Sequence, residues 1–334
     1  MTIGTGDVVL VTGATGFTGR HLVRTLCETG ATVRAIVRPT SNLDEIRDLP
    51  IEFVEGEVYD PEVCARAAKG VTHVFHVAAA FREAKVGDAV YAKVHVESTQ
   101  HLARAVTGQP GFRRFLHVST MGVHGHIDEP PATEEYRFAP GDLYQETKVE
   151  GELWVRDHAK TTGMPLTVVR PAGIYGPGDR RLLKVFKMAK MPVVPMLGYG
   201  SKGLYHLIHV RDLVDFMILA ATHEKTLGEV YICGAAEPIA VTDMIRVIAR
   251  KLGTSPRFVR LPVTPFFVAG DICEAICKPF GIEPPIYRRR VAFFTKDRAF
   301  DTSKLRRDTG FTYTYPNEKG LTDLADWYVR QGWL

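Results

Sequence analysis

Near its start the chain reads Val8-Val9-Leu10-Val11-Thr12-Gly13-Ala14-Thr15-Gly16-Phe17-Thr18-Gly19-Arg20. The apolar residues that open this stretch are consecutive rather than alternating, which is typical of a parallel strand buried on both faces. Three glycines, each separated from the next by two residues, then predict a tight turn into a helix over residues 17–28. A strand, a glycine turn and a helix in this order predict the start of an α/β fold.

The same turn predicts a dinucleotide site. Gly13 permits the turn, Gly16 lets the backbone approach a pyrophosphate, and Gly19 lets the helix pack closely on the strand. The helix N-terminus adds free N–H groups and a positive dipole end. A glycine-rich turn without a ligand is the alternative, but the strand before it and the helix after it favour the cofactor site. We expect the cofactor to contact Thr12, Gly13, Thr15, Gly16, Phe17 and Gly19.

The bulk composition is that of an ordinary globular protein. The chain has 334 residues, with 45% hydrophobic and 24% charged residues and a formal net charge of +4. Such a small charge gives no reason to expect a nucleic-acid partner. No apolar run approaches the ~20 residues that span a bilayer, and no signal-peptide pattern precedes the first strand. Five scattered cysteines indicate reduced thiols, so we expect a cytoplasmic protein without a metal site.

Further apolar runs continue the alternation of strands and helices. We predict strands over residues 31–37, 51–54, 71–77 and 112–119, with a long amphipathic helix over 86–106 before the last of them. This order predicts an α/β protein with a Rossmann-type, doubly wound parallel sheet.

Cofactor choice depends on the residue that follows the second strand. Arg38 occupies this position, and no acidic residue that would bind the ribose hydroxyls lies beside it. A guanidinium matches a 2′-phosphate, so we expect NADP, with NAD possible if Arg38 is merely solvated. We also expect Glu57 and Val58 at the adenine edge, and the small residues Ala78 and Ala79 under the cofactor.

A second motif supplies candidate catalytic residues. Tyr144 and Lys148 are four residues apart, so on a helix they share one face. An ammonium near a phenol stabilises the phenolate and lowers the tyrosine pKa from its usual value of ~10. A tyrosine in that setting exchanges a proton with an alcohol or a ketone. The motif is common by chance, and it gains weight here because it follows a nucleotide-binding turn.

With these motifs, the chain resembles the extended short-chain dehydrogenases/reductases, which include the NAD(P)-dependent epimerases and dehydratases. The resemblance covers almost the whole length. It rests on residues 12–19, on Tyr144 with Lys148, and on Arg170-Pro171-Ala172-Gly173-Ile174-Tyr175-Gly176-Pro177-Gly178-Asp179 and His209-Val210-Arg211-Asp212-Leu213. It implies a cofactor domain of residues 1–175 and about 207–235, and a substrate lobe of about 176–206 and 236–334. It also implies cofactor contacts from Lys148 and Pro171, and a homodimer formed through helices at about 86–106 and 142–162.

The resemblance further implies a catalytic hydroxyl at the end of the fifth strand. Counting back from Gly125 places it at Thr120, and Ser119 points to the opposite face if the strand continues. The chain departs from the family at His95, where relatives often have asparagine. If this position only supports the lysine, histidine is tolerable, whereas a required amide would alter the proton relay.

Within the superfamily, the chain most resembles the 3β-hydroxysteroid dehydrogenase and dihydroflavonol-reductase-like branch. Dehydratases have an Asp-Glu pair where this chain has Met121-Gly122, and epimerases commonly have an asparagine where it has Gly173. We therefore expect an NADP-preferring oxidoreductase that interconverts a secondary alcohol and a ketone on a small, apolar substrate. A nucleotide-sugar 4-epimerase with tightly held NAD and a dinucleotide-sensing protein without activity are the alternatives.

The substrate itself is not identified by the sequence. The residues that we expect around it are Phe81, Met121, Gly173, Tyr175 and Arg180. The apolar, proline-punctuated stretch 265–286 is interpreted as ordinary helix core, and a pocket wall or lid is the alternative. Membrane contact aided by Arg288-Arg289-Arg290 is a third interpretation.

Overall fold

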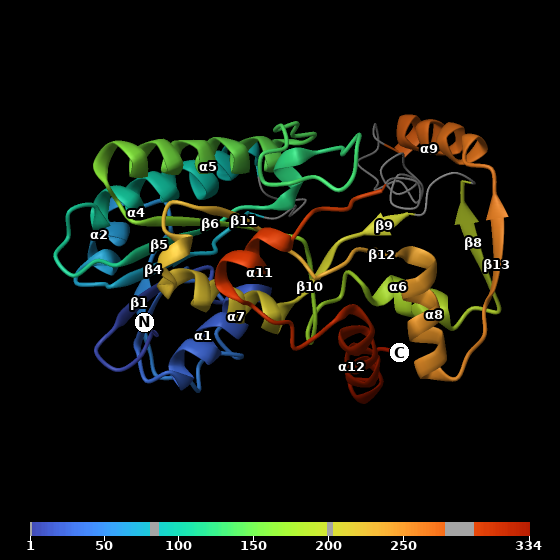
Figure 1. The fold of residues 1–334 in the computed structure, drawn as a ribbon, viewed down its shortest axis with the longest axis horizontal. Coiled ribbons are helices and arrows are strands. Elements are labelled where there is room, and N and C mark those ends of the chain that lie inside the picture. The colour runs from blue at the N-terminus through green and yellow to red at the C-terminus, as the bar shows by residue number, and fades with distance from the viewer. Residues whose placement is uncertain (1, 81–86, 199–202, 278–296) are drawn as a thin grey trace.

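A seven-stranded parallel sheet forms the centre of the larger lobe, on the left in Figure 1. The computed structural model describes residues 2–80, 87–198, 203–277 and 297–334. The strand order is β11-β6-β5-β4-β1-β2-β3. These strands are β1 (Val8–Thr12), β2 (Thr32–Val37), β3 (Ile51–Glu55), β4 (His73–His76), β5 (Arg114–Val118), β6 (Leu166–Pro171) and β11 (Val230–Cys233).

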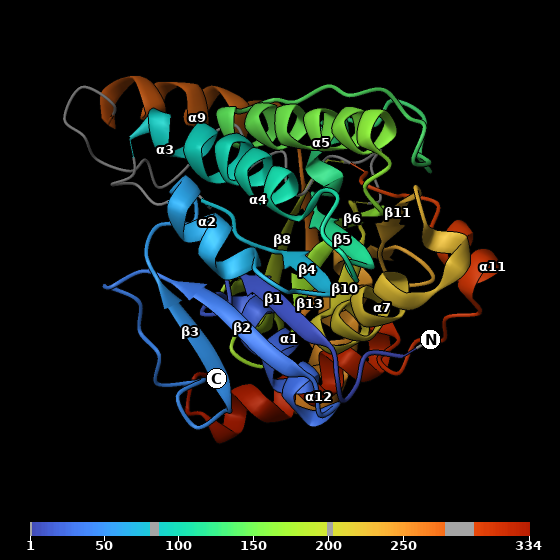
Figure 2. The ribbon, with the colours of Figure 1, turned by 90° about the vertical axis from the view of Figure 1, so that its left-hand side faces the viewer.

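Helices cover both faces of this sheet, as expected for a doubly wound fold (Figure 2). One face carries α2 (Pro61–Ala68), α4 (Ser98–Val106) and α5 (Leu143–Thr162), which pack against one another, and the other carries α1 (Phe17–Glu28) and α7 (Val210–Thr222). The fold prediction is confirmed, and the first helix has the predicted bounds. The predicted helix 86–106 is described from α3 (Asp88–Ala92) onward, and a π-helical turn (Lys93–Glu97) joins α3 to α4.

Strand register places polar residues from three strands in one row. Thr12 pairs with His76 across β1 and β4, and His76 pairs with His117 across β4 and β5. All three side chains are buried, at 0%, 1% and 1% exposure. This polar row crosses the three strands at or beside their carboxyl ends, where ligands of such folds bind.

A smaller lobe has its own core. It contains α6 (Leu183–Ala189), α8 (Val241–Leu252), α12 (Asn317–Arg330), and the parallel pair β8 (Val193–Leu197) and β13 (Arg257–Leu261). Phe186, Ile245 and Tyr328 are fully buried in this core. The remaining elements are β7 (Gly173–Tyr175), β9 (Leu204–Tyr205), β10 (Leu207–His209), β12 (Ile239–Ala240), α9 (Thr264–Cys277), α11 (Ser303–Thr309) and 3₁₀ turns at Met121–His124 and Glu224–Thr226.

The structure corrects the interpretation of the apolar stretch after residue 264. In α9, Val268, Ile272 and Ile276 are 53–60% exposed, and only Gly270 is buried. The described part of this stretch is therefore not ordinary helix core: its apolar residues at helical spacing form a stripe that the described residues leave exposed. Cys273 and Cys277 do share a helix face, with their sulfurs 3.9 Å apart. Residues 278–286 and the run Arg288–Arg290 lie outside the described residues.

Within the described ranges, none of the helices combines the length and apolar character needed to cross a membrane.

Candidate active site

The glycine turn has the backbone that a phosphate site requires. Gly13 has φ +71°, and a Cβ there would lie 2.9 Å from the backbone of Ala78. A Cβ on Gly19 would lie 2.0 Å from the Gly13 carbonyl oxygen, so only glycine allows α1 to approach the turn. Gly16 precedes α1 and provides no side-chain cap. The first-turn amides of α1 are thus left for an external acceptor, which fits a dinucleotide phosphate.

Thr12 secures the strand end beside this turn. Its hydroxyl accepts hydrogen bonds from the amides of Val77 (3.2 Å) and Ala78 (3.1 Å), and therefore donates to His76 Nδ1 at 2.8 Å. The other ring nitrogen of His76 then donates to Thr99 Oγ1 at 2.9 Å. Burial lowers the pKa of His76 to about 3, so this histidine is neutral and its tautomer is fixed.

His95 joins the segment after β4 to helix α5. It lies in the π-helical turn, is 1% exposed, and accepts a hydrogen bond from the amide of Ala80 at Nε2 (3.0 Å). Its Nδ1–H donates to Thr147 Oγ1 at 2.8 Å. The His95 ring also meets the Tyr144 ring edge to face, with centroids 5.3 Å apart. Burial lowers the pKa of His95 to about 2, so it holds these contacts as a neutral ring.

Helix α5 carries both residues of the second motif. Asp142 caps the helix by accepting from the amide of Gln145 at 2.9 Å, and Tyr144 lies in its first turn, partly exposed. Lys148 follows one turn later at 3% exposure, and its ammonium donates to the Val118 carbonyl oxygen at 2.6 Å. Burial lowers the pKa of Lys148 to about 8. The lysine is thus fixed at the end of β5, next to the predicted hydroxyl.

The two hydroxyls at that strand end have different surroundings. Thr120 is partly exposed, and its Oγ1 accepts from the amide of Gly122 at 3.1 Å. Ser119 is 5% exposed and lies near the carboxylate of Glu152, whose pKa it helps to lower. Alternation along the strand therefore directs Ser119 into the protein, and Thr120 has the more open position.

The Arg-Pro motif at the end of β6 is a structural support. Arg170 is 1% exposed and binds Glu152 on α5 through two hydrogen bonds, of 3.0 and 2.5 Å. It also donates to the carbonyl oxygen of Glu134 at 2.7 Å. Burial alone would raise the pKa of Glu152, but the bonds and charge of Arg170 outweigh it and the pKa is lowered. Pro171, the predicted cofactor contact, ends β6 and is itself buried.

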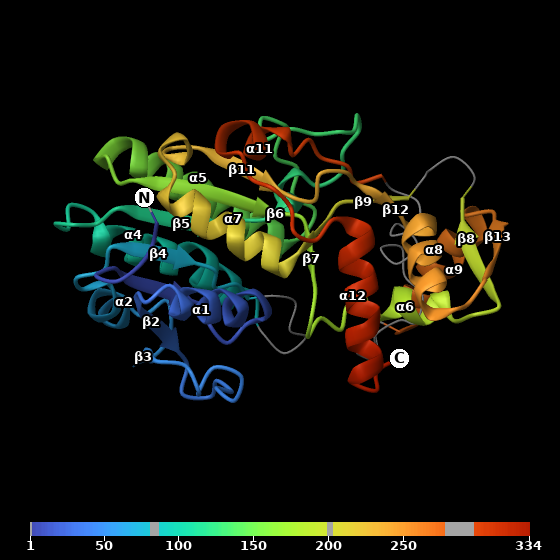
Figure 3. The same cartoon turned by 60° about the horizontal axis from the view of Figure 1, so that its bottom comes forward.

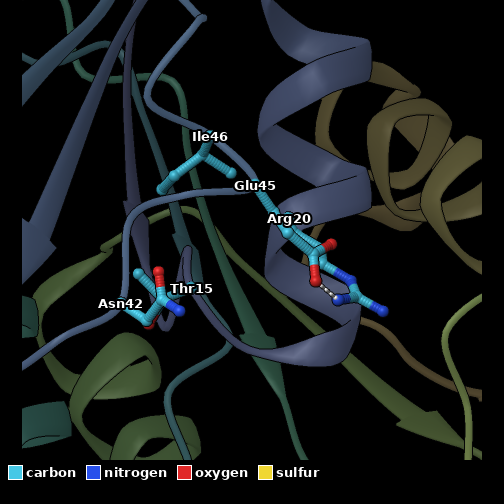
Figure 4. A pocket seen from close by; sticks show the side chains of 5 residues that line it. All are labelled: Thr15, Arg20, Asn42, Glu45 and Ile46. Carbon is cyan, nitrogen blue, oxygen red and sulfur yellow. Dashed lines mark hydrogen bonds and ion pairs between the residues drawn. The ribbon is translucent and has the colours of Figure 1, made fainter.

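The predicted adenosine end lies beyond β2. Arg38 is exposed and begins a turn in which its amide donates to Ser41 Oγ at 3.2 Å. Glu57 and Val58 are partly exposed, and Arg38 and Glu57 both lie close enough to Tyr59 to influence its pKa. A cavity of about 110 Å³ separates the glycine turn from the loop after Arg38 (Figure 4). It is lined by Thr15, Arg20, Asn42, Glu45 and Ile46.

Of the predicted substrate residues, the structure brings only some near the end of β5. Met121 follows Thr120 directly and is partly exposed, and Gly173 lies in β7, where a Cβ would be 3.2 Å from the His206 carbonyl oxygen. Tyr175 is 1% exposed, and a Cβ on Gly320 would be 2.0 Å from its hydroxyl oxygen, so it belongs to the core. Arg180 stacks over Trp333, on the C-terminal side of α12. Phe81 lies outside the described residues.

Comparison with known proteins agrees with this arrangement. Residues 9–234 match the model of the NAD dependent epimerase/dehydratase family. The chain belongs to this family. It is 31% identical to a 3 beta-hydroxysteroid dehydrogenase/Delta 5→4-isomerase of Mycobacterium tuberculosis, over 96% of this chain and 90% of that protein. It is 29% identical to a ceramide reductase of Caulobacter vibrioides, over 98% and 96% of the two chains.

Solved structures share the fold of this chain. The crystal structure of a UDP-glucose 4-epimerase from Thermotoga maritima has a TM-score of 0.75 at 21% identity, over 97% of this chain and 99% of that one. This member of the epimerase/dehydratase family is an NAD-dependent enzyme with a Rossmann-like fold.

Sequence reasoning missed three parts of the site. The roles of His76, His117 and the pair Glu152–Arg170 were not predicted, although each lies buried beside Lys148 or Tyr144 in the fold. A signal for the histidines was present, because a histidine ends the apolar run at 73–76 and another lies within 114–118. The partners of His76 come from β1 and α4, which the pattern of a single strand does not reveal, and the ring nitrogens of His117 have no hydrogen-bond partner among the described residues.

Proposed function

We propose that this protein is an NADP-preferring oxidoreductase that interconverts a secondary alcohol and a ketone on an apolar, hydroxysteroid- or flavonol-like substrate. The observation that carries the proposal is the fixed position of Lys148, buried one helical turn after Tyr144 and bonded to the strand end that precedes Thr120. The curated relatives with dehydrogenase and reductase names support the same reaction class.

In this proposal Tyr144 exchanges the proton with the substrate oxygen. Lys148 stabilises the phenolate by its charge and holds the nicotinamide ribose. Thr120 orients the substrate oxygen: its Oγ1 already accepts from Gly122, so its own hydrogen is available to donate. The nicotinamide, when bound, supplies or accepts the hydride. The backbone at Gly16 and the N-terminus of α1 hold the pyrophosphate, Gly13 and Gly19 allow the turn and the close packing of α1, and Arg38 holds the 2′-phosphate.

A dehydratase reaction is disfavoured by the residue types at 121–122, where Met121 and Gly122 begin a 3₁₀ turn. An elimination of water needs an acid and a base at that place, and neither side chain supplies one. The exposed apolar stripe Val268–Ile272–Ile276 adds an apolar surface to the substrate lobe.

The test is a spectrophotometric assay with purified protein, NADP or NAD, and a panel of 3-hydroxysteroids, flavanonols, long-chain ketolipids and UDP-sugars. We expect net nicotinamide turnover on an apolar alcohol or ketone, abolished by Tyr144→Phe. Tyr136→Phe is the matched control, because within the described part of the chain the Tyr136 hydroxyl bonds Asp128 alone. Sugar inversion without net nicotinamide turnover would instead identify an epimerase, and cofactor binding without any turnover would identify a sensor.

A further inference from the structure

A groove is lined by residues of helix α1 and of the C-terminal end of helix α12 and the residues after it. Figure 3 shows where these two helices lie in the fold. The volume of the groove is about 540 Å³, within the range of small-molecule sites. None of the proposed catalytic residues lines it. The lining residues are Arg20, His21, Arg24, Glu45, Pro177, Gly178, Arg180, Trp327, Gln331 and Trp333.

The charges of this groove are predominantly positive. Three guanidinium groups line it against a single carboxylate, that of Glu45. Arg20 is paired with Glu45, and Arg24 with Asp48 at 3.3 Å. Arg180 has no carboxylate partner among the described residues, and its guanidinium carbon lies 4.3 Å from the centroid of the Trp333 ring. A guanidinium held against an indole keeps its outer donors available for an anion.

The wall that carries Arg180 is built before any ligand arrives. Trp333 meets Trp327 edge to face, with centroids 4.9 Å apart, and stacks on Tyr328 at 5.8 Å. The Tyr328 hydroxyl donates to the carbonyl oxygen of Asp179 at 2.6 Å, which fixes α12 to the segment that precedes Arg180. Little side-chain freedom is left to lose on binding, which favours affinity.

Glycine at position 178 keeps the opposite wall in place. Gly178 has φ +92°, and a Cβ there would lie 1.7 Å from the Nη2 of Arg20. Any other residue would therefore displace the Arg20 guanidinium from the groove. The Nε2–H of His21 donates to the carbonyl oxygen of Pro177 at 3.2 Å, and burial lowers the pKa of His21, so it adds no charge of its own near neutral pH.

We propose that this groove is a second binding site, for a small anion that carries phosphate groups. Three guanidiniums in one groove match phosphate oxygens in charge and geometry. The tryptophan wall excludes water from one side of the anion, which strengthens its contacts.

The site is coupled to the cofactor cavity through one ion pair. Arg20 and Glu45 line both the groove and the cavity of about 110 Å³ beside the glycine turn. An anion that engages Arg20 competes with Glu45, and Glu45 belongs to the loop that walls the cofactor cavity. Anion and cofactor therefore change each other's affinity by the same factor. This coupling rests on the proposed cofactor position, whereas anion binding itself does not.

Inorganic pyrophosphate is the probe, titrated into the protein saturated with NADP so that the glycine turn is occupied. Binding is followed by tryptophan fluorescence in a Trp154→Phe background, which leaves Trp327 and Trp333 as reporters. We expect saturable quenching of the fluorescence, and we expect Arg180→Gln to weaken the affinity for pyrophosphate at least tenfold. Arg250→Gln is the matched control, because Arg250 is an exposed arginine on α8 paired with Glu318 outside the groove, and it should bind as the parent does.

Citrate, as a second anion, distinguishes phosphate recognition from general charge attraction. Equal affinity of citrate and pyrophosphate would overturn the phosphate assignment, and unchanged binding by Arg180→Gln would overturn the site. Thermal unfolding shows that the variants are folded. The titration is repeated without NADP. If pyrophosphate affinity then falls on substitution of Gly16 but not on substitution of Arg180, the anion binds at the glycine turn alone. These outcomes do not depend on turnover, so loss of the proposed activity leaves the binding result separate.

Discussion

His95 Nδ1 lies 2.8 Å from Thr147 Oγ1, and this hydrogen bond completes a chain of bonds from the glycine-turn strand to the helix of Tyr144. The chain runs from Thr12 through His76 to Thr99, whose hydroxyl donates to the carbonyl oxygen of His95 at 2.7 Å. Every member is buried and neutral, so the chain positions groups without carrying charge. The position of the proposed acid/base thus depends on the strand that binds the cofactor.

Replacement of His95 by leucine should therefore reduce both stability and turnover. It leaves the Ala80 amide without its acceptor, at a cost of about 1–3 kcal/mol. It also removes the donor to Thr147 Oγ1, which keeps its own bond to the Leu143 carbonyl oxygen at 2.8 Å. We expect the free energy of unfolding, measured in urea, to fall by about 1–3 kcal/mol and kcat to fall at least tenfold.

His95→Asn is the conservative partner of that variant. An asparagine amide both donates and accepts, so it should recover a large part of kcat. A leucine variant with normal kcat and normal cofactor KM would show that His95 has no positioning role. If both variants lose stability but keep kcat, the hydrogen-bonded chain serves only the fold.

Gly151 explains how closely the π-helical turn approaches α5. A Cβ on Gly151 would lie 2.4 Å from the carbonyl oxygen of His95, so Gly151→Ala must separate the two segments. We expect the overpacking cost to exceed the helix-propensity gain and to lower the free energy of unfolding by about 1–2 kcal/mol. Gly141→Ala, whose Cβ would meet no atom closer than 3.6 Å, is the control and should be neutral.

The elements that sequence predicted well are those with a local signal. The run Val8–Val11 and the glycines after it predict a strand, a turn and a helix from Phe17, where the structure has β1 and α1, because consecutive apolar residues and the positive-φ Gly13 act within a few residues of themselves. Tyr144 and Lys148 share a helix face for the same reason, since spacing alone determines it.

Side chains that act across elements were not predictable in that way. Tyr175 was expected at the substrate and is core, because Gly320, from a helix near the end of the chain, packs on its hydroxyl. The α9 stripe was expected to be buried because helical spacing usually reports packing, yet no described residue buries its side chains. Burial in both cases depends on whether residues remote in sequence pack against the side chain, and a local pattern does not report that.

The buried pair of Glu152 and Arg170 offers a third prediction. Glu152→Gln leaves Arg170 with an uncompensated charge at 1% exposure, so we expect a loss of about 3–5 kcal/mol of unfolding free energy. Chemical denaturation measures it, and the exposed pair Arg250–Glu318 gives the control: Glu318→Gln should change stability by less than about 1 kcal/mol. The double variant Glu152→Leu, Arg170→Met should recover part of the loss, and failure to do so would show that the remaining bonds of Arg170 dominate.

Arg38 is the proposed determinant of cofactor choice. Arg38→Ser removes one charge-assisted contact with a 2′-phosphate, worth about 1.5–3 kcal/mol, so the KM for NADP should rise about 10–100-fold while that for NAD changes little. Steady-state kinetics with both cofactors measure the ratio. Arg47→Ser, an exposed arginine in the same loop region paired with Asp44, should leave both values as they were. An equal change for NAD and NADP would show that Arg38 does not read the 2′-phosphate.

Lys148 should give the protein an unusual dependence of stability on alkaline pH. Its pKa is lowered by burial to about 8, against about 10.4 in an unfolded chain, so the unfolded state binds the proton more tightly. The free energy of unfolding is therefore highest above pH ~10, where Lys148 is neutral in both states. It falls by about 3 kcal/mol in total as the pH decreases from about 10 through about 8, because the unfolded chain takes up the proton first.

Lys148→Met removes this pH dependence while giving up one hydrogen bond to the Val118 carbonyl oxygen. At pH 7 the variant should thus be at least as stable as the parent in urea denaturation, although inactive, and its advantage should shrink as pH rises from 8 to 10. If Lys148→Met is less stable than its parent by the same amount at every pH, the pKa of Lys148 is not lowered in the folded protein. Burial of its ammonium then has no cost in folding free energy.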